Sequence, residues 1–335
     1  MFGGQELPED EDRTEDEHPE ESRPIMANDD TLDLEDLDIP GALAAVGHTK
    51  TVNATRRLPN LESALLRPVQ RLEIGYSRDI GMVRPNNEDS IYVSYSSQMN
   101  VGDRPDVGVF IVADGAGGHQ EGERASAIAS RMVAEALNAQ LLRPMLDESD
   151  DSDEVELPPI AEVLTEAIKA ADARIRERVP GSGTTLTAAV LIGNLVHIAH
   201  VGDSRAYLFI PESEDEEARL EQLTRDHSVA KRLEEIGHIT REEADHHPEA
   251  SRLWKIMGLT DNLEPDISTR RLPPGTQLVL CSDGMWNMVP SDELLAVLST
   301  SSTPQEAADI LVAAANAHGG SDNISVIVLH MPQGN

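Results

Sequence analysis

The sequence of 335 residues contains a single cysteine, Cys281, and only 3% aromatic residues. One cysteine excludes an intramolecular disulfide and a zinc site built on several thiolates. No apolar run approaches the roughly 18 residues of a membrane-spanning helix, and the N-terminus is acidic where a signal peptide is basic and then apolar. These absences predict a protein of the cytoplasm, a reducing compartment, that has no membrane partner.

Positive charge is also scarce, because 61 Asp and Glu face 27 Lys and Arg, which gives a formal net charge of −34. A field of that sign repels phosphate backbones and anionic lipids, so it argues against nucleic acid and membrane surfaces as partners. The chain is nevertheless long enough to bury the core of one large domain or of two small ones.

The acidic charge is concentrated at the N-terminus. The first 40 residues carry 16 acids, two bases and four prolines, and they cannot bury enough apolar surface to offset chain entropy. We therefore predict a disordered tail and linker over residues 1–66 and a folded domain over residues 67–335. An acidic-apolar stretch at residues 32–39 leaves two alternatives, a solvated tail and a segment that docks a partner.

Hydrophobic patterning predicts strands and helices in mixed order within the folded domain. Gly193-Asn194 supplies the positive φ of a tight turn and predicts a hairpin. The strands follow one another or flank helix pairs, which favours antiparallel sheets over a doubly wound parallel sheet. The expected strands are residues 90–94, 107–113, 186–192, 195–201, 206–210, 278–281 and 324–330. The expected helices are residues 121–142, 160–178, 229–236, 292–298 and 304–318, with acidic loop insertions at 147–156 and 212–217.

Four short acidic segments lie at the ends of the apolar strands. They are Asn87-Glu88-Asp89, Asp114-Gly115, Ser282-Asp283-Gly284 and Asp322-Asn323. Carboxylates at buried strand ends need partners, and too few Lys or Arg are near in sequence to supply them. Carboxylate and carbonyl oxygens suit Mg²⁺ or Mn²⁺, and a pair of such ions needs a bridging carboxylate and several flanking ones. Asp-Gly pairs are also ordinary turn signals, so a structural role for these segments stays open at this point.

One arginine, Arg84, precedes Glu88 by four residues. A guanidinium fork matches a phosphate group, so this arginine beside an acidic metal cluster suggests metal-assisted hydrolysis of phosphoesters. The alternative is a surface arginine paired with one of the many acids.

Seven motifs in a fixed order strengthen the first interpretation, because seven weak signals in the right order leave little room for chance. Together they resemble the bacterial branch of the metal-dependent type 2C protein Ser/Thr phosphatases (the PPM family), over roughly residues 72–331. The first two motifs are Gly81-Met82-Val83-Arg84-Pro85-Asn86-Asn87-Glu88-Asp89-Ser90 and Val112-Ala113-Asp114-Gly115-Ala116-Gly117-Gly118-His119. The others are Gly183-Thr184-Thr185-Leu186-Thr187-Ala188, His200-Val201-Gly202-Asp203-Ser204-Arg205-Ala206-Tyr207, Leu223-Thr224-Arg225-Asp226-His227-Ser228, Cys281-Ser282-Asp283-Gly284 and Ser321-Asp322-Asn323-Ile324-Ser325.

The resemblance implies an α+β fold, a sandwich of two antiparallel sheets with helices on both outer faces. It implies hydrolysis of phosphoserine and phosphothreonine in proteins by a metal-bound water or hydroxide at a centre of two Mn²⁺ or Mg²⁺ ions, in opposition to a Ser/Thr kinase. The implied roles are distributed over seven residues. Asp114 bridges the two ions, the Gly115 carbonyl binds one, Asp283 and Asp322 hold the other, Glu88 and Asp89 act at the cluster directly or through water, and Arg84 binds the substrate phosphate.

Two departures from the family pattern affect the chemistry. Ala116 occupies the position of a histidine that some members carry as a proposed general acid, so the leaving-group proton must come from elsewhere. The segment 179–182 before the Gly-Thr-Thr motif contains no acid, which leaves a third ion in doubt or dependent on another acid. Residues 232–259 correspond to the flap beside the active site, where substrate choice could be encoded.

Several residues in the motifs have structural interpretations. We expect Asp203 to order its loop and to pair with Arg205, and Thr184 and Thr185 to form hydrogen bonds at a strand start. Cys281, Trp254 and Trp286 are interpreted as packing residues. His119 and His227 are second-rank candidates for proton transfer, since a lone histidine is more often structural. The rival function is a non-catalytic pseudophosphatase that binds phosphoproteins, and a phosphatase of small metabolites is a further alternative.

Overall fold

The computed structural model describes residues 72–97, 105–116, 121–146 and 158–331, apart from residues 215, 246 and 250. The predicted tail over residues 1–66 and the acidic insertion at 147–156 lie outside this part of the chain, so both stay predictions. His119 lies outside it as well.

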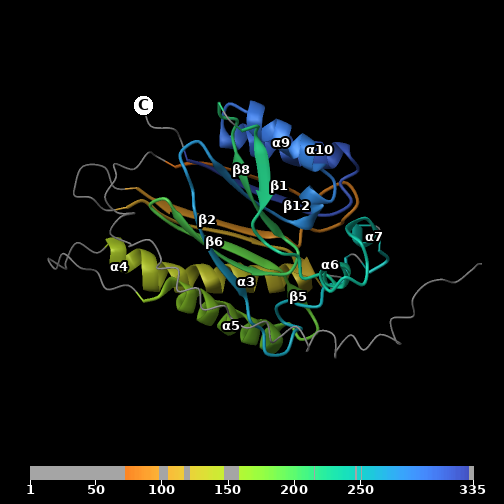
Figure 1. The fold of residues 1–335 in the computed structure, drawn as a ribbon. Coiled ribbons are helices and arrows are strands. Elements are labelled where there is room, and N and C mark those ends of the chain that lie inside the picture. The colour runs from red at the N-terminus through yellow and green to blue at the C-terminus, as the bar shows by residue number, and fades with distance from the viewer. Residues whose placement is uncertain are drawn as a thin grey trace, which may run out of the picture. The chain divides into compact units, whose positions relative to one another are not determined.

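Two antiparallel sheets of five strands each form the centre of the described domain (Figure 1). One sheet has the order β1-β12-β11-β8-β9 and the other the order β10-β7-β6-β3-β2, with a short β4-β5 pair beside them. The first six strands are β1 (Glu73–Asp79), β2 (Ser90–Ser96), β3 (Val107–Ala113), β4 (Gly115–Ala116), β5 (Gly183–Thr184) and β6 (Leu186–Ile192). The remaining strands are β7 (Leu195–Val201), β8 (Arg205–Ile210), β9 (Arg219–Gln222), β10 (Asp266–Arg271), β11 (Gln277–Cys281) and β12 (Ile324–His330).

Helices cover the outer face of each sheet, which gives four layers. The described helices are α3 (Glu121–Leu137), α4 (Arg143–Leu146), α5 (Ile160–Arg178), α6 (Val229–Glu235), α7 (Arg241–Asp245), α8 (Asp283–Trp286), α9 (Ser291–Thr300) and α10 (Pro304–Ala317). Helices α3 and α5 lie on one side of the sandwich and α9 and α10 on the other (Figure 1). The predicted α+β sandwich is therefore confirmed, and no helix in the described part combines the length and apolar character that a bilayer span requires.

Three apolar clusters hold these layers together. One fills the space between the sheets with side chains such as Phe110, Leu280 and Ile327. The second packs α3 and α5 on their sheet, and the third packs α9 and α10 on theirs. β3 is buried along its whole length because it lies inside its sheet and has apolar residues on both faces, which explains its continuous hydrophobic run.

Most of the predicted elements are confirmed within a few residues, but five strands, β1, β4, β5, β9 and β10, were not predicted. Strands β6 and β7 have the expected bounds, and Gly193 between them has a φ of 60°. β1, β9 and β10 are polar strands at the edges of the sheets. Each becomes part of a sheet because it pairs with an apolar neighbour, as β1 pairs with β12. The predicted helix over residues 121–142 contains a π-helical turn, Asn138–Leu142, that periodicity did not indicate.

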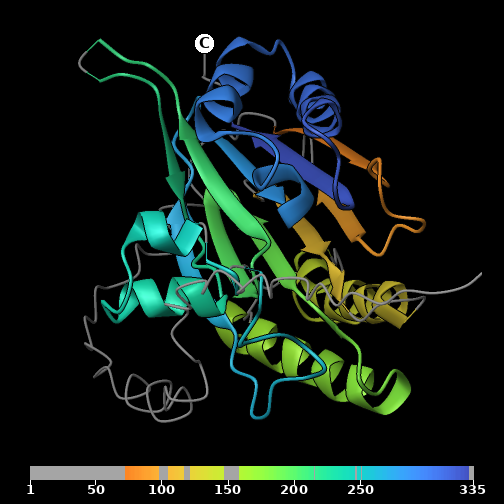
Figure 2. The same ribbon diagram turned by 90° about the vertical axis from the view of Figure 1, so that its right-hand side faces the viewer.

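The acidic loop at 212–217 lies where it was predicted, in the connection between two strands. Figure 2 shows the β8–β9 hairpin reaching beyond its sheet, with this connection at the tip. Its acids are exposed wherever the structure describes them, and the hairpin tip lies away from the strand ends that carry the motifs.

Candidate active site

Antiparallel pairing brings the four acidic segments together. β2 begins directly after Asp89 and β3 ends directly before Asp114, and their register pairs Ser90 with Ala113. β11 ends before Ser282 and β12 begins after Asn323, and their register pairs Cys281 with Val326. Each sheet therefore contributes two adjacent acidic segments, and both pairs face the same cavity.

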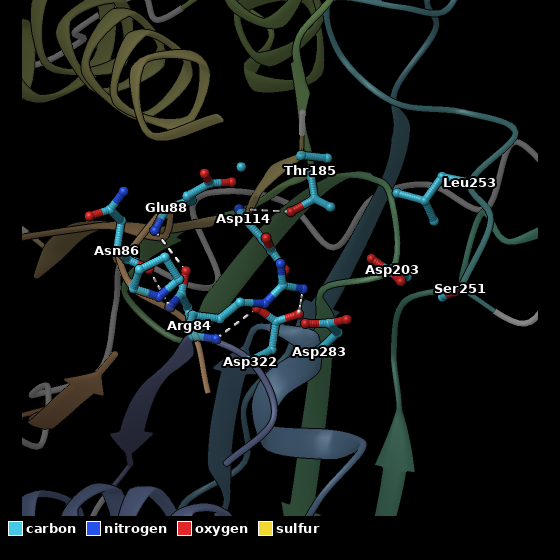
Figure 3. A pocket seen from close by; sticks show the side chains of 14 residues that line it. Arg84, Asn86, Glu88, Asp114, Thr185, Asp203, Ser251, Leu253, Asp283 and Asp322 are labelled. Atoms are coloured by element: carbon cyan, nitrogen blue, oxygen red, sulfur yellow. Dashed lines mark hydrogen bonds and ion pairs between the residues drawn. The ribbon is translucent and has the colours of Figure 1, made fainter. Parts of the chain in front are cut away.

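This cavity has a volume of about 510 Å³ and is shown in Figure 3. The predicted site residues that line it are Arg84, Glu88, Asp114, Gly115, Asp283 and Asp322. Ala116 also lines the cavity, at the position where the histidine is absent. Arg84 lies among the acids and its Nη2 is 2.6 Å from the Asp322 carboxylate, although about half of its side chain remains exposed.

Burial, and then the crowding of carboxylates, raise the proton affinity of the acids in the cavity. Burial, and then the charges of Asp89 and Asp283, raise the pKa of Asp114 well above its ordinary value. Burial, and then the charge of Asp322, raise the pKa of Asp283 to about 6. Such a cluster is unfavourable as bare anions, and a cation stabilises it.

The seventh predicted site residue, Asp89, does not line the cavity and is buried beside Ser282. Its side chain is only 2% exposed, and the Ser282 hydroxyl donates a hydrogen bond of 2.8 Å to Oδ2. Burial, and then the charge of Asp283, raise the pKa of Asp89 to about 7. Its other carboxylate oxygen, Oδ1, is buried without a hydrogen-bond partner in the described structure.

Uncharged side chains hold the acidic segments in place. The Asn323 side chain accepts a hydrogen bond from the Glu88 amide and donates to the carbonyls of Ile80 and Asn86, so it fixes the loop that carries Arg84. The Asp114 amide donates to the Thr185 hydroxyl, and the Thr184 hydroxyl donates to the Asp114 carbonyl. The structural role expected for both threonines is thereby observed.

The acidic cluster has the donors that hard divalent cations prefer. Oδ1 of Asp89 and Oδ1 of Asp283 are buried and make no hydrogen bond in the described part of the chain. Their unmet bonding capacity, together with the raised proton affinity of the cluster, fits a Mg²⁺ or Mn²⁺ site. No three described Asp, Glu, His or Cys side chains already form a metal-binding group, and Arg84 engages Asp322, so carboxylates would turn toward an ion on binding.

Asp203 departs from its sequence interpretation. The expected pair with Arg205 is not formed, because the Arg205 guanidinium binds Asp226 through two nitrogens and lies 3.4 Å from the Trp286 ring centre. The Trp286 indole donates to the Asp203 carbonyl and fixes that loop. The Asp203 side chain instead lines the cavity, where burial and then the charge of Asp283 raise its pKa well above the ordinary range.

His227 and Cys281 are both away from the cavity. The His227 side chain is fully buried, accepts a hydrogen bond from the Gly202 amide, and lies 3.2 Å from the Asp266 carboxylate. Burial lowers the pKa of His227 and raises the pKa of Cys281 to about 12, so both are neutral at neutral pH. His227 therefore holds the Gly202–Asp203 loop, and Cys281 is the core residue that the sequence predicted.

Sequence reasoning did not identify a role for three residues near the site, Asn323, Ser251 and Leu253. Asn323 was noted only as the neighbour of Asp322, and nothing local signals its three hydrogen bonds. Ser251 and Leu253 line the cavity from the predicted flap, on the side opposite Arg84 (Figure 3). The sequence signal for Ser251 and Leu253 was their position within the predicted flap, residues 232–259.

Comparison with known proteins gives a consistent result. The family model described as protein phosphatase 2C matches residues 87–314. The serine/threonine phosphatase stp of Listeria monocytogenes is 35% identical over 261 residues, which cover 76% of this chain and 94% of that protein. The protein phosphatase PhpP of Streptococcus pneumoniae is 32% identical over 267 residues, which cover 78% of this chain and 98% of that protein.

Solved structures are similar over the same part of the chain. The serine/threonine phosphatase of S. agalactiae superposes with a TM-score of 0.63 and 32% identity, covering 78% of this chain and all of that one. The catalytic domain of the serine/threonine protein phosphatase PstP, solved in complex with two manganese ions, has a TM-score of 0.58 and 31% identity, covering 78% of this chain and all of that one.

Proposed function

Because the chain belongs to the protein phosphatase 2C family, we propose that its acid-lined cavity hydrolyses phosphoserine and phosphothreonine in proteins with two Mn²⁺ or Mg²⁺ ions. The predicted family and its serine/threonine phosphatase activity are confirmed by the matches above. The observation that supports the proposed site is the convergence of Arg84 and carboxylates from four separate segments on one cavity.

The proposed ligand set follows the positions of the acids. Asp114 would bridge the two ions, the Gly115 carbonyl would bind one, and Asp283 and Asp322 would hold the other. Glu88 and Asp89 would act at the cluster directly or through water. When bound, the ions supply Lewis acidity that activates the attacking water and neutralises phosphate charge. Asp203 is the additional acid beside Asp283 on which a third ion could draw.

Arg84 is suited to orient the substrate phosphate. Its guanidinium is half exposed at the cavity and engages Asp322 in the absence of ligand. A phosphate offers the guanidinium two oxygens and a larger negative charge than one carboxylate, so exchange of partner would free Asp322 for an ion. Ala116 has no proton to give, which assigns protonation of the leaving group to water or to another side chain.

The first prediction tests this assignment. Protein stripped with a chelator should hydrolyse p-nitrophenyl phosphate and a phosphothreonine peptide only after Mn²⁺ is added. Asp114→Ala or Asp283→Ala should reduce turnover by about 100-fold or more, since each removes a carboxylate from the cluster. Asp261→Ala is the control, because that side chain is 93% exposed and does not line the cavity. Full turnover in either site variant would refute the ligand assignment, and no turnover by the wild-type protein with metal bound would favour the phosphoprotein-binding pseudophosphatase.

The proposed partners are phosphorylated proteins, in opposition to a Ser/Thr kinase in the cytoplasm. The acidic residues 1–66 have two alternative roles, docking of such a partner and solvation of the domain. If they dock a partner, their removal should weaken turnover of a phosphoprotein and leave p-nitrophenyl phosphate hydrolysis unchanged. If the truncated protein turns over the phosphoprotein as fast as the full chain, the segment is a solubility device.

A further inference from the structure

A second cavity of about 410 Å³ adjoins the acid-lined cavity and shares Asp203 and Ser251 with it. We propose that this second cavity binds an anionic side chain of the substrate, either a carboxylate or a second phosphate, close in sequence to the phosphoresidue that is hydrolysed. The inference rests on the proposed function, since it names the substrate class of the same site.

The two cavities differ in charge. Five carboxylates and one arginine line the first cavity, and the arginine is already paired with Asp322. Three cations, Arg205, Lys231 and Arg241, line the second cavity together with two acids. A local excess of cations is notable in a chain with a net charge of −34, and it makes this the face of the site that attracts an anion.

Existing contacts show which cations are available to a ligand. Arg205 and Asp226 neutralise each other through a close ion pair, 2.6 Å from Nη2 to Oδ2. Lys231 lies 2.6 Å from Glu234, yet its ammonium has three donors and a third of its side chain is exposed. Arg241 is exposed, and none of the five donors of its guanidinium forms a hydrogen bond or ion pair with a described residue.

The helices that carry these cations are attached to the wall of the acid-lined cavity. Lys231 lies on α6 and Arg241 on α7, and the two short helices pack together beside the sheets (Figure 2). Ser228, which caps α6, forms a β-bridge with Leu253, a residue that lines the first cavity. The position of the cations relative to the phosphate site is therefore fixed by main-chain bonds rather than by a free loop.

A substrate chain can reach both cavities at once. Asp203 and Ser251, the shared residues, lie on the side of the first cavity opposite Arg84 (Figure 3). A peptide whose phosphate binds at Arg84 would leave across this side and enter the second cavity. An extended chain advances about 3.3 Å per residue, so only a few residues separate the phosphoresidue from its anionic neighbour.

The test uses phosphothreonine peptides that are neutral apart from the phosphate, and versions with a glutamate or a second phosphoserine scanned along both sides. We expect wild-type enzyme with Mn²⁺ to favour one placement of the second anion. The double variant Arg241→Gln, Lys231→Gln should lower kcat/KM on that peptide by about three- to tenfold, mainly through KM. Hydrolysis of the neutral peptide and of p-nitrophenyl phosphate should be unchanged. Arg174→Gln is the control, because Arg174 is a partly exposed, ion-paired arginine that lines neither cavity.

Peptide binding, measured by fluorescence anisotropy with the same labelled peptides, separates this inference from the proposed activity. If the double variant loses the preference and Arg174→Gln keeps it, the result supports the subsite, whether or not turnover occurs. A wild-type protein without preference, or a preference that survives in the double variant, overturns it. Preference for glutamate identifies acidic substrates, and preference for phosphoserine alone identifies multiply phosphorylated ones. Absence of p-nitrophenyl phosphate hydrolysis would contradict the catalytic proposal and not the subsite.

Discussion

The charged residues of the cavity depend on neutral residues that hold them. Asn323 is 4% exposed and bonds to three main-chain groups of the segment between β1 and β2, with distances from 2.7 to 2.9 Å. Ser126 on α3 donates to the Glu88 carbonyl from the opposite side. Glu88 and Arg84 are therefore presented by a loop that Asn323 ties to the start of β12 and Ser126 ties to α3.

Substitution Asn323→Ala should damage this loop. It removes the acceptor of the partly buried Glu88 amide and the donor to two carbonyls, and we expect a loss of about 2 to 3 kcal/mol in the free energy of unfolding. Mn²⁺-dependent kcat/KM should also fall, because Arg84 and Glu88 lose their fixed positions. Chemical denaturation and steady-state kinetics measure the two effects. Asn316→Ala is the control, since the Asn316 side-chain oxygen has no hydrogen-bond partner among the described residues. Equal stability losses in both variants would contradict the role given to Asn323.

At the scale of elements, the sequence predicts what is encoded locally. β6 and β7 are apolar along their length and joined by Gly193-Asn194, so composition and turn chemistry both determine their bounds. β10 reads Asp-Ile-Ser-Thr-Arg-Arg, which has no strong local preference, and it becomes a strand because its backbone pairs with β7. The predicted strands are those rich in apolar residues. Three of the missed strands, β1, β9 and β10, are polar strands at sheet edges, and their own residues do not signal the pairing.

The same distinction applies to the site. Glu88, Asp114, Asp283 and Asp322 were predicted to converge because each lies in a recognisable motif at a strand end, and the cavity brings them together. Asp203 was assigned a pair with Arg205 because the two are near in sequence. Asp226 and Trp286, which are far from Arg205 in sequence, bind the guanidinium instead and leave Asp203 to the cavity. Contacts between loops of different elements are the part that local patterns do not encode.

At the scale of the whole molecule, two cavities of different charge adjoin in a strongly acidic chain. The first concentrates carboxylates whose repulsion is relieved by cations. The second contains Arg241, which pairs with no described acid, and Lys231, which has more donors than its pair with Glu234 uses. In the proposed function, this arrangement separates metal binding from recognition of the substrate chain. The free energy of unfolding should then depend on pH and on divalent ions.

The last prediction concerns this dependence. Burial raises the pKa of Asp89 to about 7 and that of Asp283 to about 6, so between about pH 4 and pH 7 the folded state binds more protons than the unfolded state. The free energy of unfolding contributed by these groups therefore falls as pH rises through that window in metal-free protein. Mn²⁺ binds the deprotonated cluster, so the stabilisation that it adds should grow with pH.

Thermal unfolding with chelator and with Mn²⁺, at about pH 5 and about pH 7.5, measures this coupling. We expect the increase in Tm on adding Mn²⁺ to be larger at the higher pH by roughly 4 to 8 °C, equivalent to about 2 kcal/mol. Burial lowers the pKa of His200 to about 3, which gives an opposite slope, but that slope is present with and without metal and cancels in the difference. Asp283→Asn should remove most of the pH-dependent increase and Asp261→Asn none of it. An increase of the same size at both pH values would show that the buried carboxylates do not bind the ion, because ligands that must lose protons bind metal more weakly in acid.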